Sequence, residues 1–405
     1  MPHRLPLVFI LATVTLDAIG IGLIFPVMPD LIREVMHTSL SGAAIWGGVL
    51  VSSFAAMQFL FGPLVGHLSD AFGRRPVLLI SLAVMCVDYV IMALAGSIWL
   101  LIAGRILGGI ASATHATASA FVADISRPEE KSARFGLVSA AFGVGFVIGP
   151  VIGGLLADFG TRAPFWAAAV LAAANLGFGL AVMPETVTDR IRRKFDLRRG
   201  NPLSALRAMR HLPGMGALLA VFTLYHVSTE VYPVIWAYFT QARFGWDTRL
   251  VGVSLTVYGA ALVVVQALLI RPILNWLGDR RTVLAGFGWE AASLLLLAFV
   301  TSGPLAMVLT PITAIGGVTL PALQGELSRS VPDDAQGELQ GVLSSLMALT
   351  MIGAPLVYTT TFRAFTAESA PAYMPGAPFL VSLGFVVLAL VLFGLNRRAG
   401  ATSAM

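Results

Sequence analysis

Long apolar stretches, separated by short polar ones, run the length of this chain. Each is long enough to cross a bilayer as a helix, since about 20 apolar residues span the hydrocarbon core. There are twelve such runs, at about 5–31, 45–68, 77–95, 98–123, 135–156, 164–183, 215–242, 251–274, 282–300, 304–324, 339–361 and 379–395. Hardly any polar sequence lies between them, so the pattern predicts a membrane protein with spanning helices rather than a soluble helical core.

The composition agrees with this interpretation. The chain is 57% hydrophobic and 12% charged, with a mean hydropathy of +0.85, which is too apolar for a water-soluble fold. The first apolar run is too long for a signal peptide and has no small-residue cleavage site, so we expect it to remain as a membrane span. The single cysteine, Cys86, excludes an intramolecular disulfide and a thiolate metal cluster, and we interpret it as a small core residue.

The net positive charge has a local origin. Between Glu185 and His211, eight basic residues stand against three acidic ones, which accounts for the net charge of +5. We interpret this segment as a solvated linker attracted to anionic headgroups, so no nucleic-acid partner is needed to explain the charge. The linker predicts an N-terminal six-helix bundle at 1–184, a basic cytoplasmic segment at 185–212 and a C-terminal six-helix bundle at 213–405.

Basic residues also predict the orientation, and the two halves resemble each other. With the amino terminus inside, the inner segments hold nineteen lysines and arginines and the outer loops hold five. The positive-inside rule then places both termini in the cytoplasm. Gly136 and Pro150 recur 205 residues later as Gly341 and Pro355. The chain is therefore predicted to be an all-α protein with two bundles in parallel repeat, the arrangement of transporters that rock about a midplane substrate site.

The polar segment between the second and third spans, Gly66-His-Leu-Ser-Asp70-Ala-Phe-Gly73-Arg74-Arg75, has the features of a gate. Glycines allow a tight turn, and the charged residues can make contacts that close one state and part in the other. A partial copy follows the eighth span, and acidic residues end spans four and ten. The alternative is that the arginines are topological anchors and the acids only interfacial charges. The gating candidates are Gly66, Asp70, Gly73, Arg74, Arg75, Asp124, Asp279, Arg280, Arg281 and Glu326.

The same segment matches the pattern G-x-L-x-D-x-x-G-R-R throughout, and with twelve spans around it the chain resembles the major facilitator superfamily. Span five contains Phe142-Gly-Val-Gly145-Phe-Val-Ile-Gly149-Pro150-Val-Ile-Gly153-Gly154. This stretch is similar to the glycine–proline motif of the drug–proton antiporters in that superfamily. Its glycines form a small-residue face, and Pro150 a kink, suited to close packing where the halves meet. Segments 16–29, 87–89, 104–109, 243–247 and 321–324 further resemble the tetracycline-efflux branch, which implies proton-coupled drug export.

Charged residues inside the spans are the candidates for proton coupling. Asp17 and Asp88 each lie about twelve residues into a span, roughly 18 Å deep, where an aspartate must face a cavity or a partner. Burial favours a neutral carboxyl group and a nearby cation favours the charged form, so such a group can exchange a proton. Arg105 in span four is a counter-charge for one of them, or it neutralises a purely structural aspartate.

Two further carboxyl groups, Glu230 and Glu290, lie in spans seven and nine with no obvious cation in the same helix. In the tetracycline branch, acidic residues matching Asp17, Asp88 and Glu290 are implicated in transport and coupling, and an arginine matches Arg105. The resemblance therefore implies a coupling role at these positions, and Glu230 adds one more carboxyl group to the set.

Polar and aromatic residues within the spans are candidates for the substrate site. The glutamines could orient a ligand, the histidines can titrate near neutrality, and the aromatic side chains could line a cavity. Each could equally form a helix–helix contact or an interfacial anchor. The candidates are Gln58, His115, His226, Tyr232, Trp236, Tyr258, Gln266 and Gln324.

The chain also departs from that branch. Leu262 stands where the branch commonly has a histidine, Glu230 where it has a neutral amide and Glu290 where it has an aspartate. The extra carboxyl group favours cationic substrates or a second proton. The missing histidine removes a group that could bind a metal-chelated drug.

These features together predict a proton-driven antiporter of a bacterial cytoplasmic membrane that exports an amphipathic drug-sized compound, tetracycline-like or multidrug. We expect a monomer in the bilayer, driven by the proton gradient, with no cofactor or metal site, although the substrate could enter as a metal chelate. The alternatives are a proton symporter that imports a metabolite and, more distantly, a receptor. No nucleotide loop, His-Glu-x-x-His or nucleophile elbow is present, which argues against an enzyme.

Overall fold

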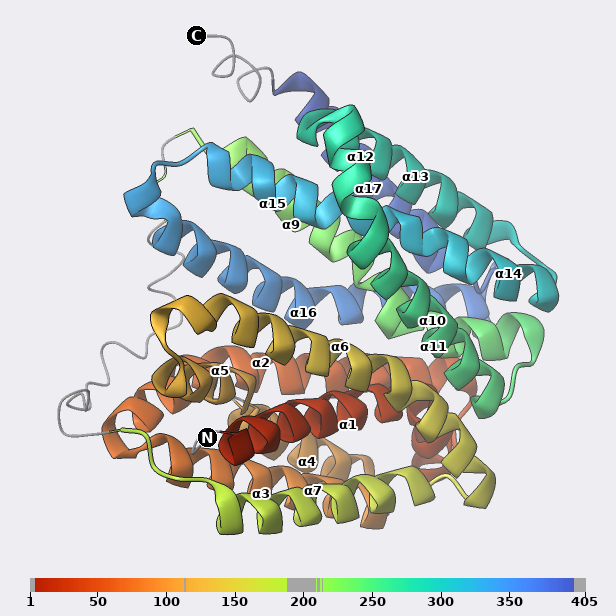
Figure 1. The fold of residues 1–405 in the computed structure, drawn as a ribbon. Helices are drawn as coiled ribbons and strands as arrows, with labels where there is room; N and C mark the ends of the chain where they lie inside the picture. The colour runs from red at the N-terminus through yellow and green to blue at the C-terminus, as the bar shows by residue number, and fades with distance from the viewer. Residues whose placement is uncertain (1–3, 113, 188–208, 210–211, 213, 397–405) are drawn as a thin grey trace, which may run out of the picture. The chain divides into compact units, whose positions relative to one another are not determined.

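The computed structural model of this chain describes residues 4–112, 114–187, 209, 212 and 214–396 (Figure 1). It contains twelve helical stretches long and apolar enough to cross a membrane. The twelve predicted spans are thus confirmed, and none of the described residues forms a strand. The basic residues of the predicted linker lie outside the described residues.

The first six spans are mostly single helices. They are α1 (Arg4–Met36), α2 (Leu40–Phe72), α3 (Arg74–Leu94), α4 (Ile98–Ala111) followed by α5 (Thr114–Ile125), α6 (Lys131–Leu156) and α7 (Ala163–Val182). Serine and proline mark their beginnings: the side chain of Ser97 accepts a hydrogen bond from the Leu100 N–H, and Pro164 lies in the first turn of α7.

The last six spans are more often interrupted. They are α9 (Gly216–Thr229) with α10 (Val231–Phe244), α11 (Thr248–Val264) with the π-helical turn η5 (Val265–Leu269) and α12 (Ile270–Leu277), α13 (Asp279–Phe299), α14 (Gly303–Thr313) with the 3₁₀ turn η6 (Ala314–Val318) and α15 (Thr319–Arg329), α16 (Gln336–Thr366) and α17 (Ala377–Leu395). The turns η5 and η6 contact each other.

Proline explains two of these interruptions. Pro233 has no N–H for the carbonyl of Thr229, and span seven breaks at Glu230, between α9 and α10. Pro272 likewise cannot bond to the carbonyl of Leu268, and η5 lies just before it. Irregular backbone at membrane depth is tolerated only where protein covers it or where it lines a cavity. The interruptions therefore point to functional regions.

The predicted gate segment is more helical than expected. Helix α2 continues through Gly66 and Asp70 to Phe72, so the turn consists of Gly73 alone, with φ 114°. Gly278 stands alone in the same way between α12 and α13, with φ 72°. Side chains other than glycine are strained at such angles, which explains why the turn has the same residue in both halves.

The chain forms two compact units. Unit 1 comprises Met1–Thr38, Val49–Pro202 and Thr248–Thr256, and unit 2 comprises Ser39–Gly48, Leu203–Asp247 and Val257–Met405. These units follow the predicted bundles except in two short segments, the beginnings of α2 and α11. The domain boundaries at the central linker stay a prediction.

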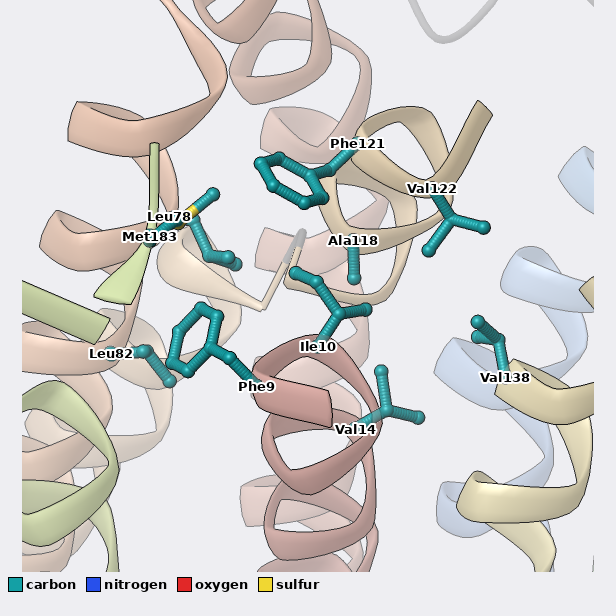
Figure 2. Packing of buried hydrophobic residues seen from close by; sticks show 10 residues of the cluster. All are labelled: Phe9, Ile10, Val14, Leu78, Leu82, Ala118, Phe121, Val122, Val138 and Met183. Atoms are coloured by element: carbon teal, nitrogen blue, oxygen red, sulfur yellow. The ribbon is translucent and has the colours of Figure 1, made fainter. Parts of the chain in front are cut away.

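The end of unit 1 that contains the start of α1 has an apolar core. Figure 2 shows Phe9, Ile10 and Val14 of α1 packed among side chains of α3 and α5, with Val138 of α6 beside them. A second buried cluster, which includes Leu23, Met85 and Tyr89, joins α1, α3 and α7. These contacts hold α1 in the middle of unit 1, where it carries Asp17.

Candidate functional site

A buried ion pair between two membrane-spanning helices joins Asp88 of α3 to Arg105 of α4. The Arg105 Nη2 donates to Asp88 Oδ2, and the guanidinium also lies over the ring of Phe54, 5.3 Å from its centroid. The Asp88 side chain is 0% exposed and that of Arg105 is 9% exposed. Of the two aspartates that the sequence offered as partners for Arg105, the structure pairs it with Asp88.

Two glycines of α4 make room for this ion pair. A Cβ added to Gly104 would lie 2.8 Å from Asp88 Oδ1, and one added to Gly108 would lie 2.5 Å from Oδ2. The stretch Gly104-Arg-Ile-Leu-Gly108 thus presents a guanidinium and a flat backbone to the same carboxylate. The pair does not use all of its hydrogen-bonding atoms, because Asp88 Oδ1 and Arg105 Nε have no hydrogen-bond partner among the described residues. Such a pair can gain a proton without losing other hydrogen bonds.

Asp17 lines a small cavity in unit 1 whose other walls are mainly apolar. The cavity has a volume of about 10 Å³ and is also lined by Tyr89 and Asn175. The Asn175 amide donates to the hydroxyl of Thr13 at 3.1 Å, whereas the buried hydroxyl of Tyr89 has no partner among the described residues. A space of this size is at the lower limit for one water molecule. The sequence analysis assigned no role to Tyr89 or Asn175.

Glu290 is the buried carboxyl group of unit 2. It lies on α13, is 3% exposed and faces the backbone of η6, where a Cβ on Gly316 would lie 2.7 Å from its Oε2. The Tyr225 hydroxyl donates to the carbonyl of the same glycine at 3.3 Å. No ion pair joins Glu290 to a described residue, and its Oε1 lacks a hydrogen-bond partner there. Unlike Asp88, Glu290 is therefore surrounded by neutral groups.

The other candidates for the substrate site in unit 2 differ in exposure. Tyr232 stacks on Tyr258 with ring centroids 6.0 Å apart and an interplanar angle of 23°. Trp236 is 4% exposed and packs near Phe239, as a core side chain does. Gln266 is exposed and lies on the π-helical turn η5. Single π-helical turns within α-helices are often found at functional sites.

Four further candidates are distributed over other helices. Gln58 on α2 and Gln324 on α15 are half-buried. The side chain of His115 lies outside the described residues. His226 on α9 is buried, and its Nδ1 lies 3.7 Å from Glu230 Oε1. The neighbour of Glu230 in its own span is therefore a histidine one helical turn earlier, which is a cation only when it is protonated.

Arg74 lies at the centre of the first gate segment. Its Nη1 contacts Asp70 Oδ1 at 2.5 Å, and its Nε donates to Asp124 Oδ2 at 3.2 Å. Asp124 ends span four, so the acidic end of that span does contact the arginine pair. Arg75 instead donates to the carbonyl of Leu180 at 3.0 Å.

Glu185 belongs to this cluster, although the sequence analysis counted it only among the linker charges. Its Oε1 accepts the backbone N–H of Arg74 at 2.9 Å and its Oε2 that of Arg75 at 3.2 Å. A carboxylate there binds the positive end of the α3 dipole. A Cβ on Gly73 would collide with it, so Gly73 provides space as well as its unusual φ. The only signal of this role in the sequence was that Glu185 is an acidic residue directly after a span.

The second gate segment uses a different arginine. Arg329 of α15 contacts Asp279, and its Nη2 also lies 3.1 Å from Glu326 Oε2. Arg280 donates to the carbonyls of Phe393 and Asn396, and Arg281 is exposed. The expected pairing of Glu326 with the second arginine pair is therefore not seen. Its partner is an arginine on its own helix.

The glycine–proline motif of α6 packs mainly within unit 1. A Cβ on Gly145, Gly149 or Gly153 would collide with the backbone of α1. Gly154 faces Thr248 and Arg249 at the beginning of α11, which belong to the same unit. Helix α6 continues through Pro150. Most of the small-residue face thus serves the contact between α1 and α6.

Comparisons with known proteins agree with this arrangement. A family model described as the Major Facilitator Superfamily matches residues 10–355. The chain is 45% identical over 358 residues to the tetracycline resistance protein, class C, of Escherichia coli, which covers 88% of this chain and 90% of that protein. It is 39% identical over 354 residues to the class G protein of Vibrio anguillarum, covering 87% and 89% of the two chains.

A solved structure has the same fold. The nucleoside transporter NupG matches with a TM-score of 0.80 and 13% identity, over 96% of this chain and 98% of that one. At this identity the likeness shows the fold alone, and it confirms the predicted fold class of two six-helix bundles.

Proposed function

Because this chain belongs to the Major Facilitator Superfamily, we propose that it is a proton-driven antiporter that exports an amphipathic, drug-sized compound across a bacterial cytoplasmic membrane. The observation that carries the proposal is the buried pair of Asp88 and Arg105, which lies within membrane spans and retains unused hydrogen-bonding atoms. A buried charge within a span is costly and by default marks a functional site.

A proton can act on this pair in a simple way. Protonation of Asp88 removes the negative charge that faces Arg105, so the guanidinium loses its counter-charge and a different packing of α3 and α4 becomes favourable. Asp17, which lines the small cavity beside Tyr89, offers a second acceptor for the proton. Loss of the proton restores the ion pair and the first packing. Transport is driven because proton and substrate favour different states of the protein.

Glu290 supplies the corresponding group in unit 2. With only neutral neighbours among the described residues, an ionised Glu290 needs hydration or a cationic ligand. Its contact with η6 ties this change to a part of span ten that is not regular α-helix.

The substrate class follows from the named relatives. Two tetracycline resistance proteins align with most of this chain, so we propose tetracycline-like compounds, with the stacked Tyr232 and Tyr258 and the exposed Gln266 among the contacting residues. The protein would work as a monomer with both termini in the cytoplasm, and the proton gradient would replace any cofactor. The substrate could be carried as a metal chelate, which omission of divalent cations from the assay would reveal.

Everted membrane vesicles provide the test. With an imposed pH gradient, acidic in the lumen, vesicles that contain the protein should accumulate tetracycline in the lumen, and an agent that collapses the gradient should release it. Vesicles with the Asp88→Asn variant are the control. If tetracycline instead moves in the same direction as the protons in right-side-out vesicles, the protein is a symporter and the export proposal is wrong.

A further inference from the structure

His226 and Glu230 form a polar cluster at the point where span seven breaks. Glu230 is the single residue between α9 and α10. Its Oε1 lies 3.7 Å from Nδ1 of His226. This distance is too long for a hydrogen bond, but at this separation a protonated His226 and an ionised Glu230 attract each other strongly.

Thr350 of α16 lies against the histidine ring. Its hydroxyl donates to the carbonyl of Met347 at 2.6 Å and lies 3.4 Å from Nδ1 of His226. With its proton used in this way, the threonine oxygen accepts from the ring in the tautomer that carries hydrogen on Nδ1. In that tautomer Nε2 is available for a second proton.

Among the described residues, the charged groups on the elements packed against α9 are either paired or at helix ends. Helix α17 has no charged residue, Glu326 on α15 is paired with Arg329, and Arg243 on α10 donates to the carbonyl of Val300. The charged residues of α16, Glu338 and Arg363, lie in its first and last turns. On α16, Tyr358 donates to the carbonyl of Val227 at 2.7 Å. In the part of the chain that the structure describes, His226 is the only basic group within ion-pair distance of Glu230.

On the basis of the proposed antiport, we propose that His226 and Glu230 form an additional proton site, which binds one proton per cycle beyond those taken up by Asp88 and Glu290. An ionised Glu230 beside a neutral histidine is an uncompensated buried charge, and one proton on either group neutralises the pair. The two side chains are 11% and 14% exposed, so the proton can enter and leave this site.

The position of the pair connects its proton to the shape of span seven. Glu230 is the residue at the break that Pro233 creates, and His226 lies one turn before it on α9. Ser228, between them, is hydrogen-bonded to Ser382 of α17 at 2.7 Å. Movement of α10 relative to α9 would therefore change the distance between the two groups. A state that separates them releases the proton, and a state that brings them together retains it.

The number of protons exchanged per substrate tests this site. Purified protein in liposomes is given a series of pH gradients, with the membrane potential held at zero by valinomycin and equal potassium, and the accumulation of tetracycline is measured at equilibrium. For each proton exchanged, accumulation rises about tenfold per pH unit, so the slope of its logarithm gives the number of protons. We expect Glu230→Gln to lower this slope by about one relative to the unmodified protein. Glu368→Gln, an exposed carboxyl group in unit 2, should leave it unchanged.

A second variant protects the test against misfolding of the first. His226→Gln keeps the carboxyl group but removes its basic neighbour, so the slope should stay the same while the midpoint of the pH dependence of transport moves. An unchanged slope in Glu230→Gln, or an unchanged midpoint in His226→Gln, overturns the proposed site. If the unmodified protein does not accumulate tetracycline in response to a pH gradient, the proposed antiport itself fails, which is a different result.

Discussion

At the scale of single residues, the interior of this protein contains two kinds of carboxyl group. Asp88 is ionically paired with Arg105, whereas Glu290 contacts neutral groups only, among the described residues. Removing one partner of a buried ion pair leaves an uncompensated charge, while replacing both partners by neutral residues can be almost neutral for stability. Comparing single variants with the double variant therefore distinguishes what Asp88 and Arg105 contribute to stability from what they contribute to transport.

We expect Asp88→Asn and Arg105→Gln each to lower the free energy of unfolding by about 3 kcal/mol. The double variant should regain most of this stability but not proton-driven transport, because no group remains that can exchange the proton. Thermal unfolding in detergent and vesicle transport measure the two effects. Asp158→Asn, in an exposed pair with Arg249, is the control and should cost less than about 1 kcal/mol. A double variant as unstable as the sum of the singles would contradict the pairing.

Glu290→Gln gives the other residue-scale prediction. The amide has the shape of the protonated acid, and the groups around Glu290 are neutral. The fold and substrate binding should therefore be retained. Uphill transport should be lost, because the amide cannot release a proton. Equilibrium binding of tetracycline to purified protein measures the retained binding, and accumulation in vesicles measures the loss of uphill transport. Normal proton-coupled accumulation in this variant would remove Glu290 from the coupling groups.

At the scale of elements, glycines determine how closely helices of unit 1 approach. Gly145, Gly149 and Gly153 bring α6 against α1, and Gly20 on α1 gives space to the hydroxyl of Tyr89 on α3. Close packing through small residues is the usual way for membrane helices to associate, because lipid tails are as apolar as the side chains. Asp17 and the cavity that it lines thus depend on the glycines of two helices, α1 and α6.

Gly20→Ala tests this packing. The new methyl group would overlap the Tyr89 hydroxyl, and overpacking of this kind costs about 2 kcal/mol of stability. Tyr89→Phe in the same chain should restore part of the loss, because it removes the atom that collides. Gly177→Ala on α7, where no atom lies within 4 Å, is the matched control and should be neutral or slightly stabilising. Equal effects of the two alanines on thermal unfolding would show that Gly20 is not a contact residue.

At the scale of the whole molecule, the gate segments repeat one arrangement with different residues. In both halves a single glycine with positive φ joins two spans, and one arginine bridges two carboxylates. In the first half the arginine is Arg74 of the segment itself, and in the second it is Arg329 of span ten. The two halves therefore share an arginine that bridges two carboxylates at the ends of spans, but the arginine comes from a different position in each half.

Asp70→Asn should weaken this pattern in the first half only. Arg74 would keep Asp124, and Glu185 would still cap α3, so the fold should persist. We expect slower turnover with the same set of transported compounds, because Asp70 lies at the end of α2 rather than at mid-span. Initial rates and a resistance profile of cells expressing the variant check this. A changed set of compounds would show that the segment contacts substrate.

The sequence by itself determined the twelve spans, the two gate segments and which charges lie within the membrane. These are local properties: a run of about 20 apolar residues must cross the bilayer, and a charge within it must find a cavity or a partner. It also indicated that glycines are needed at the turns, which Gly73 and Gly278 satisfy.

The tertiary structure alone decided which groups meet. It paired Arg105 with Asp88 rather than Asp17, brought Glu185 to the start of α3 and turned the α6 glycines toward α1. These contacts depend on how each helix is rotated and which helix lies beside it, and no single span encodes either. The pair of His226 and Glu230 is intermediate: its spacing of four residues was visible in the sequence, but only the break in span seven shows why it matters.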